Sequence, residues 1–234
     1  MRFLVTRPQP DCRRTADKLR YLGAEADEAP MLVQRVTAPP AFDLDDVTAL
    51  AVTSRRTAEI LGNHDQAGQL EKLPVYAVGD STAQALRTAG FQTVYSADGD
   101  IEALARLIGA SIQTGPVLYA CARDRAGNLE GLLNGAGIGC RLSEVYAMEP
   151  AKSLPSHVFR HIADGVYDAV LVYSARTALA FRQALENAGL HENLGALIVV
   201  AISEKAGEPL SGAHRLKIPA KPREDALLEL ALRA

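Results

Sequence analysis

The feature of this sequence that most limits its fold is an internal repeat. The stretch ALAVTSRRTAEIL at residues 49–61 is similar to AVLVYSARTALAF at residues 169–181, about half a chain later. Each copy has a short apolar run, then Ser-X-Arg-Thr, then apolar residues at helical spacing. A repeat of this kind indicates that one supersecondary plan is used twice.

Further segments repeat in the same order. The stretch LPVYAVGDSTAQAL at residues 73–86 has a weaker echo in LIVVAISEKAGEPL at 197–210, and the opening RFLVTRP at 2–8 parallels PVLYACARDR at 116–125. Short apolar strands therefore alternate with helices that stop at glycine, which is the pattern of parallel sheets covered on both faces. The sequence predicts an α/β protein with two similar parallel-sheet domains that arose by internal duplication.

Two extended, proline-closed stretches interrupt this pattern, at residues 32–40 and 143–155. If they pair, the middle of the chain becomes one domain and the two ends join to form the other. We therefore expect one domain from 1–33 together with 152–234, a second from 38–143, and a two-stranded extended connector made of 34–37 and 144–151. A plain split into halves near residue 114 is the alternative.

Bulk composition excludes several classes of protein. A net charge of −3 and a pI near 6.0 disfavour a general nucleic-acid or membrane-surface protein. The apolar run from Phe3 to Val5 is too short for a signal peptide, and no stretch is long enough to span a membrane. Three cysteines without metal-ligand spacing indicate reduced thiols and a cytoplasmic location.

The familiar motifs of nucleotide, zinc and serine-hydrolase sites are missing from the sequence. His157 and His161 are four residues apart, but a solvated helix face explains them better than a metal, and no metal site is predicted.

Hydroxyls and arginines do recur where strands end, and in a parallel sheet these ends face the ligand. Together with helix N–H groups they suit a substrate with several carboxylates. The predicted substrate-binding residues are Arg7, Thr53, Ser54, Arg55, Gly79, Ser81, Thr82, Ser174 and Ser203. For Ser54, Ser81, Thr82 and Ser174 the alternative is simple helix capping, and for each arginine it is a solvated surface charge.

Tyr146 lies in the second predicted connector, just before Met148, Glu149 and Pro150. If the connectors join two domains, its phenol faces the cleft between them and can donate a proton or a hydrogen bond without carrying charge. The alternative is an aromatic residue that packs the linker.

Taken in order, these segments resemble the uroporphyrinogen-III synthase family. The resemblance rests on LVTRP, VTSRRTA, AVGDSTAQALRTAGF, SEVYAMEP, VLVYSARTA and the closing PAKPREDALLELAL. It implies two α/β domains with a two-stranded connector. It also implies the cyclisation of hydroxymethylbilane to uroporphyrinogen III with inversion of ring D and loss of water, without a cofactor. In that reaction Tyr146 would help the hydroxyl leave.

We also expect a monomer that binds no nucleic acid or membrane, with transient hand-over of substrate from hydroxymethylbilane synthase. One departure stands out. AISEKAGEPL places Ser203 at a usual glycine and Ala206 at a usual threonine, so Ser203 or Lys205 would replace that threonine.

Two functions of other classes remain open. A non-catalytic module binding a tetrapyrrole or another polyanion would use the same fold, and Tyr146 favours the enzyme. A methyltransferase-like enzyme would need a glycine-rich loop after the first strand, where VTRPQPDC stands.

Overall fold

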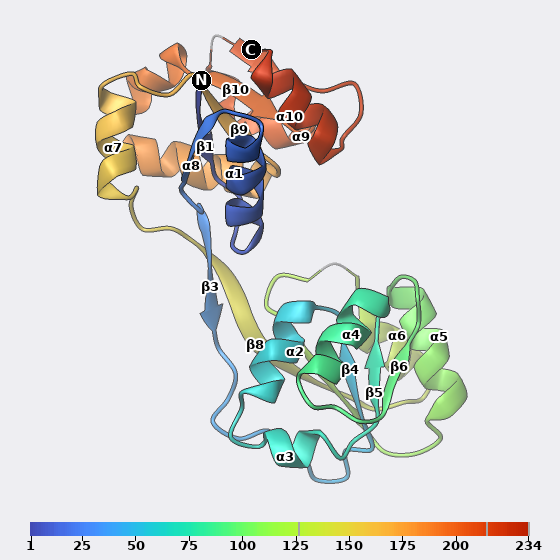
Figure 1. The fold of residues 1–234 in the computed structure, drawn as a ribbon. Coiled ribbons are helices and arrows are strands. Elements are labelled where there is room, and N and C mark those ends of the chain that lie inside the picture. The colour runs from blue at the N-terminus through green and yellow to red at the C-terminus, as the bar shows by residue number, and fades with distance from the viewer. Residues whose placement is uncertain (126, 214, 234) are drawn as a thin grey trace. The chain divides into compact units, whose positions relative to one another are not determined.

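The computed structural model describes residues 1–125, 127–213 and 215–233, and its chain divides into two compact units. One unit is Met1–Gln34 with Glu149–Ala234, and the other is Arg35–Met148. Each unit contains a sheet of parallel strands with helices packed on it (Figure 1). The α/β class with parallel sheets, predicted from the alternation of apolar runs, is confirmed.

The first unit contains a five-stranded sheet in the order β11-β10-β9-β1-β2, with all neighbours parallel. Its elements are β1 (Arg2–Val5), α1 (Asp11–Tyr21), β2 (Glu25–Glu28), α7 (Ser156–Ala163), β9 (Ala169–Val172), α8 (Ala175–Asn187), the 3₁₀ helix His191–Ala196, β10 (Ile198–Ala201), α9 (Glu204–Gly207), the 3₁₀ helix Glu208–Leu210, β11 (Arg215–Lys217) and α10 (Glu224–Leu232). The N-terminal strand β1 thus lies between β2, from the N-terminal segment of this unit, and β9, from its C-terminal segment.

The second sheet has six strands in the order β3-β8-β7-β4-β5-β6, and from β8 to β6 every pair is parallel. Its elements are β3 (Leu32–Val36), β4 (Ala49–Val52), α2 (Arg55–Gly62), α3 (Ala67–Leu70), β5 (Val75–Ala77), α4 (Asp80–Thr88), β6 (Val94–Ser96), α5 (Ile101–Ser111), β7 (Val117–Ala122), α6 (Leu129–Gly135) and β8 (Cys140–Pro150). Both extended stretches that interrupt the sequence pattern are therefore strands, β3 and β8.

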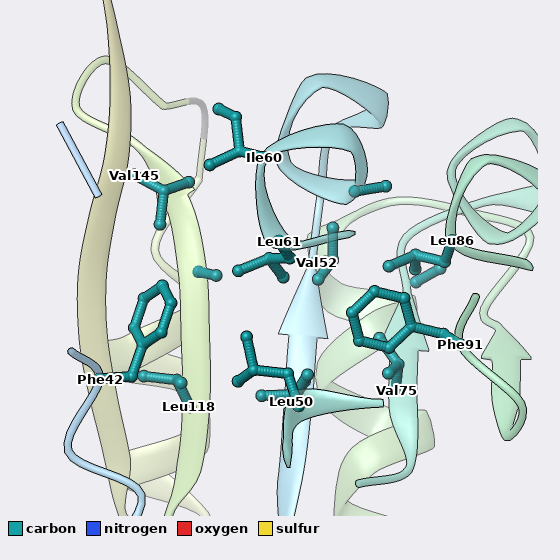
Figure 2. Close-up of a cluster of buried hydrophobic side chains, with 14 of the residues drawn as sticks. Phe42, Leu50, Val52, Ile60, Leu61, Val75, Leu86, Phe91, Leu118 and Val145 are labelled. Carbon is teal, nitrogen blue, oxygen red and sulfur yellow. The ribbon is translucent and has the colours of Figure 1, made fainter. Parts of the chain in front are cut away.

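Strand β4 shows why this sheet is buried on both faces. All four of its residues are fully buried, and alternate side chains point to opposite faces. Leu50 and Val52 pack in a core with α2 and α4, whereas Ala49 and Ala51 pack with α5 and α6. Figure 2 shows the first of these cores, in which Leu61 and Phe91 close over the strands.

In the first unit, Phe3 and Val5 of β1 pack against α1 and α10, and Leu4 between them is also fully buried. Both faces of this interior strand are therefore covered.

Among the described residues, no helix combines the length and the apolar character needed to cross a membrane.

The core of the second unit gives a test of packing. Leu61 of α2 is fully buried, so Leu61→Ala should lower the free energy of unfolding by about 2–5 kcal/mol through lost burial and a residual cavity. Leu132→Ala is the matched control, because Leu132 of α6 is 40% exposed and should change it by less than about 0.5 kcal/mol. Urea denaturation measures both, and equal effects would contradict this description of the core.

Candidate functional site

The candidate site lies where three neighbouring strands of the second unit end. Strands β7, β4 and β5 are adjacent and parallel, so the residues after their carboxyl ends meet at one edge of the sheet. A cavity of about 390 Å³ opens there. Its lining consists of Thr53, Ser54, Val78, Asp100, Ile101, Ala122, Asp124, Arg125 and Tyr146. Of the predicted site residues, Thr53, Ser54 and Tyr146 are thus brought together.

A shift in strand register aims Tyr146 toward this cavity. Cys121 of β7 is opposite Glu144 of β8, but the next residue, Ala122, is opposite Tyr146. Val145 is therefore an extra residue, a β-bulge of the kind that re-aims side chains next to functional sites. Regular alternation would send Val145 and Tyr146 to opposite faces, yet both pack in the same core.

The hydroxyl of Tyr146 donates a hydrogen bond to Ser54 Oγ, with 3.0 Å between the two oxygens. Tyr146 is only 6% exposed, so its ring packs in the core while its hydroxyl reaches the cavity wall. Ser54 is also the N-cap of α2, and its Oγ accepts a hydrogen bond from the backbone N–H of Arg56 at 3.2 Å. One serine oxygen thus holds the start of the helix and the phenol.

A second phenol, that of Tyr119, contacts Thr53. The hydroxyls of Thr53 and Tyr119 are 3.2 Å apart and share a hydrogen bond. Burial raises the pKa of Tyr119, although the hydrogen bond with Thr53 acts in the opposite direction. Sequence reasoning missed Tyr119, because in VLYACA it is indistinguishable from any other residue of a buried strand.

Three charged residues complete the cavity wall. Asp100 caps α5 by accepting a hydrogen bond from the Ala103 N–H at 2.8 Å, and Asp124 and Arg125 follow β7. Arg125 stands in an Arg-Asp-Arg run of the sequence but is not among the predicted site residues. Asp100 was missed, although its place just before an apolar helical run is the usual signal of an N-cap.

The glycine turn after β5 begins α4 differently from the capping alternative. The N-cap is Gly79, in extended conformation and without a side-chain cap, so Ser81 and Thr82 both lie inside the first turn. The interpretation of these two hydroxyls as caps is wrong, because the helix begins earlier than the hydroxyl pattern suggests. Ser81 is exposed and Thr82 is 5% exposed. Among the residues that the structure describes, the Thr82 hydroxyl has no hydrogen-bond partner.

Of the other two predicted residues in this region, Gly79 follows Val78, which lines the cavity, and Arg55 is the exposed first residue of α2. The remaining predicted residues belong to the first unit. Ser174 caps α8 and Ser203 caps α9, through hydrogen bonds from the N–H groups of Thr177 and Ala206. The capping alternative therefore holds for Ser54 and Ser174.

Arg7 is engaged by several groups of its own unit. Its guanidinium donates to Glu224 Oε1 at 2.7 Å, to Thr15 Oγ1 at 3.1 Å and to Asp11 Oδ2 at 3.2 Å, and lies 4.2 Å from the ring centroid of Tyr173. Glu224 keeps a lowered pKa despite its partial burial, because Lys18, Thr15 and Arg7 stabilise its charged form. Any substrate carboxylate that meets Arg7 has to compete with these acids.

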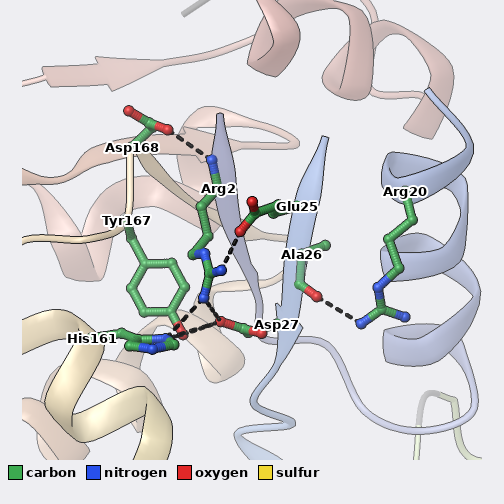
Figure 3. A network of polar contacts seen from close by, with 8 residues as sticks. All are labelled: Arg2, Arg20, Glu25, Ala26, Asp27, His161, Tyr167 and Asp168. Carbon is green, nitrogen blue, oxygen red and sulfur yellow. Dashed lines mark hydrogen bonds and ion pairs between the residues drawn. The ribbon is translucent and has the colours of Figure 1, made fainter. Parts of the chain in front are cut away.

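His161 lies in a separate polar network of the first unit (Figure 3). Its Nδ1 is 3.2 Å from Asp27 Oδ2 and 3.2 Å from Arg2 Nη1, and Tyr167 donates to the same Asp27 oxygen at 2.8 Å. Burial opposes the charge of Asp27, yet hydrogen bonds from Tyr167 and His161 and the charge of Arg2 lower its pKa. Within the described ranges, no cluster of three or more His, Cys, Asp or Glu side chains suits a metal ion.

Two comparisons with known proteins, one with family models and one with solved structures, point to the same family. The family model of uroporphyrinogen-III synthase HemD matches residues 13–229. No curated protein sequence matches the chain. The structure is similar to uroporphyrinogen-III synthetase from Helicobacter pylori 26695, with 21% identity, a TM-score of 0.62 and coverage of 100% of this chain and 99% of that chain. A mutant uroporphyrinogen III synthase from the extremely thermophilic bacterium Thermus thermophilus is similar at 18% identity and a TM-score of 0.52, covering 100% and 98% of the two chains.

The assignment of caps can be tested in the folded protein. Ser54→Ala and Ser174→Ala should each lower the free energy of unfolding by about 1 kcal/mol, because each leaves a helix N–H without its acceptor. Ser81→Ala is the control, since the exposed Ser81 caps nothing and should change stability by less than about 0.5 kcal/mol. Urea denaturation of the three variants measures this, and a full cap-sized loss in Ser81→Ala would refute the assignment of Gly79 as the N-cap.

Proposed function

Since the chain belongs to the uroporphyrinogen-III synthase HemD family, a family of cyclising lyases in tetrapyrrole biosynthesis, we propose that Tyr146 is its proton donor and the adjoining cavity its reaction site. The reaction is the closure of hydroxymethylbilane to uroporphyrinogen III, with inversion of ring D and loss of water. The observation that carries the proposal is the hydrogen bond from Tyr146 to Ser54 at the cavity wall.

The reaction requires a proton donor and a site that holds the substrate in one bent conformation. The hydroxyl of the substrate gains a proton and leaves as water, so that a cationic azafulvene remains. The last ring attacks this electrophile with the ring carbon that already carries its bridge to the third ring. The bridging carbon–carbon bond then breaks and re-forms at the free α-carbon of the last ring, which loses a proton, so the macrocycle closes with that ring inverted. One water is therefore released for each product molecule. Because the azafulvene closes unaided to the wrong isomer, positioning contributes more than proton donation.

The surroundings of Tyr146 suit the role of donor. Its phenol is held by the packed ring on one side and by Ser54 on the other, so its hydroxyl has a fixed position. A phenol donates a hydrogen bond or a proton without itself carrying a charge beforehand. We propose that the substrate hydroxyl takes the place of Ser54 as acceptor. Asp100 and Asp124, which line the same cavity, favour the positive charge that develops when water leaves.

Substrate carboxylates are proposed to meet the hydroxyls and N–H groups of the strand ends. Thr82 is the best supported of these in the second unit, because its hydroxyl has no acceptor or donor among the described residues. Gly79, Ser81, Thr53 and Arg55 are proposed as further contacts. In the first unit Arg7, Ser174 and Ser203 stay predictions, and with Ala206 at the usual threonine the role of Ser203 or Lys205 stays one as well.

We also propose that the two units are copies of one ancestral domain. Strands β4 and β9 support this, because each is followed by a capping serine and a helix that starts with the same Ser-X-Arg-Thr sequence. Strands β3 and β8 each run past the unit boundary in the sequence, which supports their role as the connector, with domains at 1–33 with 152–234 and at 38–143.

Cytoplasmic location, a monomeric state and hand-over of substrate from hydroxymethylbilane synthase remain predictions. The location is supported by three cysteines that are all free. The non-catalytic binding module is not favoured, because the family is one of enzymes.

If Tyr146 is the proton donor, a variant without its hydroxyl should be slower but should form the same product isomer. Tyr146→Phe should slow the reaction by something on the order of 10²-fold or less, because a donor is lost but the hydroxyl can leave unaided. The product should remain type III, since the walls of the cavity are kept. The measurement is a timed assay that separates type III from type I product after subtraction of spontaneous closure.

Tyr95→Phe is the matched control, because Tyr95 is 47% exposed and should keep full activity. Wild-type speed in Tyr146→Phe would reduce Tyr146 to a packing residue. Enzyme-dependent formation of type I would show that Tyr146 controls geometry rather than proton delivery.

Thr82 predicts a loss of substrate binding without unfolding. Thr82→Ala should lower kcat/KM by roughly twofold to tenfold, which corresponds to one hydrogen bond between uncharged partners or slightly more. Stability should fall by about 1 kcal/mol or less, because the residue caps nothing. Thr82→Ser keeps the hydroxyl and should retain wild-type kcat/KM. If Thr82→Ala and Thr82→Ser both equal the wild type, Thr82 has only a structural role.

A further inference from the structure

Among the described residues that line the cavity of the candidate site, Arg125 is the one cation. It follows β7 and lines the cavity beside Tyr146. It also lines a second, more polar hollow of about 630 Å³, together with Arg123, Asp124, Gly127 and Asn128. Arg125 therefore borders both spaces. Its side chain is 28% exposed, so the guanidinium is accessible to a ligand.

The partners of Arg125 leave most of its donors unused. Its Nη1 donates to the backbone carbonyl of Arg123 at 3.2 Å and lies 3.6 Å from Glu144 Oε1. Across the described part of the chain, Nε and Nη2 have no hydrogen-bond or ion-pair partner. A guanidinium offers five N–H donors in a fork that fits a carboxylate through two parallel bonds. Here, among the described residues, only Nη1 has partners, so Glu144 approaches the fork without forming the two parallel bonds.

Glu144 contacts two arginines weakly. Its Oε2 is 3.4 Å from Arg123 Nε and its Oε1 is 3.6 Å from Arg125 Nη1, and its side chain is 38% exposed. Both distances are longer than those of a charge-assisted hydrogen bond, which are about 2.7–2.9 Å. Exposed pairs of this kind contribute little to stability. The Glu144 carboxylate can therefore move away from Arg125 at a small cost in free energy.

Arg7 shows the opposite arrangement in the first unit. It has two acids and a threonine at 2.7–3.2 Å and an aromatic ring beneath it. A carboxylate ligand would have to displace well-formed ion pairs there. The second unit thus holds the more available of the two arginines.

We propose that Arg125 binds one carboxylate arm of the substrate beside Tyr146, and that Glu144 occupies the place of this carboxylate when the substrate is absent. The inference rests on the function proposed above, because it assigns a subsite to the same cavity. Since one carboxylate replaces another, the charge balance at Arg125 is unchanged when the substrate binds. The exchange also fits a cavity that has Asp100 and Asp124 in its wall. When the substrate carboxylate replaces that of Glu144, the number of negative charges in contact with Arg125 does not rise.

The exchange predicts opposite effects for the two partners. Arg125→Gln should raise KM for hydroxymethylbilane by roughly tenfold, the lower part of the range for a hydrogen bond to a charged group, with kcat changed by less than about twofold. Arg125→Lys should give an intermediate KM, because it keeps the charge but loses the fork. Glu144→Gln should lower KM by up to roughly fivefold, since a competing carboxylate is removed.

The assay follows uroporphyrinogen III formation from freshly generated hydroxymethylbilane, with urea denaturation of each variant alongside. Arg87→Gln is the matched control. Arg87 is an exposed arginine of the same unit that donates to the carbonyl of Val94, away from the residues that line the two cavities, and its KM should stay that of the wild type.

Unchanged KM in Arg125→Gln, or a loss of stability alone in Arg125→Gln and Glu144→Gln, would overturn the subsite. A higher KM in Glu144→Gln would overturn the exchange, because Glu144 would then position the arginine for the substrate. A wild-type protein that forms no uroporphyrinogen III would instead refute the proposed function itself, so the two failures are separable.

Discussion

The pairing of β7 with β8 is the contact on which the candidate site depends. Its ladder is regular as far as Cys121 and Glu144 and then shifts by one residue, so that Ala122 is opposite Tyr146. Beyond the shift the two strands stay together, since the N–H of Arg123 donates to the carbonyl of Tyr146 at 2.8 Å. This pairing places the phenol, Glu144 and the arginines that follow β7 within one small region. Without the shift, Val145 would be opposite Ala122, and Tyr146 would point to the other face of the sheet.

Much of the fold follows from local sequence pattern. The apolar runs of four to six residues, the helical spacing between them and the glycine stops are each encoded over short distances, and they are enough to predict the α/β class with parallel sheets. Capping at Ser54 and Ser174 could be predicted for the same reason, because a serine before a helical run acts on N–H groups two or three residues away. The order of the segments also identified the family, which the family model matches over residues 13–229.

The errors and omissions arise where distant segments meet. At Gly79 the hydroxyls of Ser81 and Thr82 suggested a cap, but the helix starts with a glycine, whose lack of a side chain leaves no pattern to read. Tyr119 joins the site only because β7 lies beside β4 and places its hydroxyl next to Thr53. The bulge at Val145 is a mismatch between two strands, so neither strand's sequence reveals it alone. The availability of Arg125 depends equally on what surrounds it in space.

Ser54 joins folding and chemistry at one oxygen, because its Oγ accepts from the Arg56 N–H and from the Tyr146 hydroxyl. Aspartate is as good a helix cap as serine, so a stability-guided redesign would accept it at this position. A carboxylate there would also accept the phenol's hydrogen bond, but its negative charge would strengthen the hold of Tyr146 on its proton. At this position the stability of the helix and the acidity of the phenol therefore make different demands on the side chain. A neutral hydroxyl meets both, because it caps the helix without adding negative charge beside the phenol.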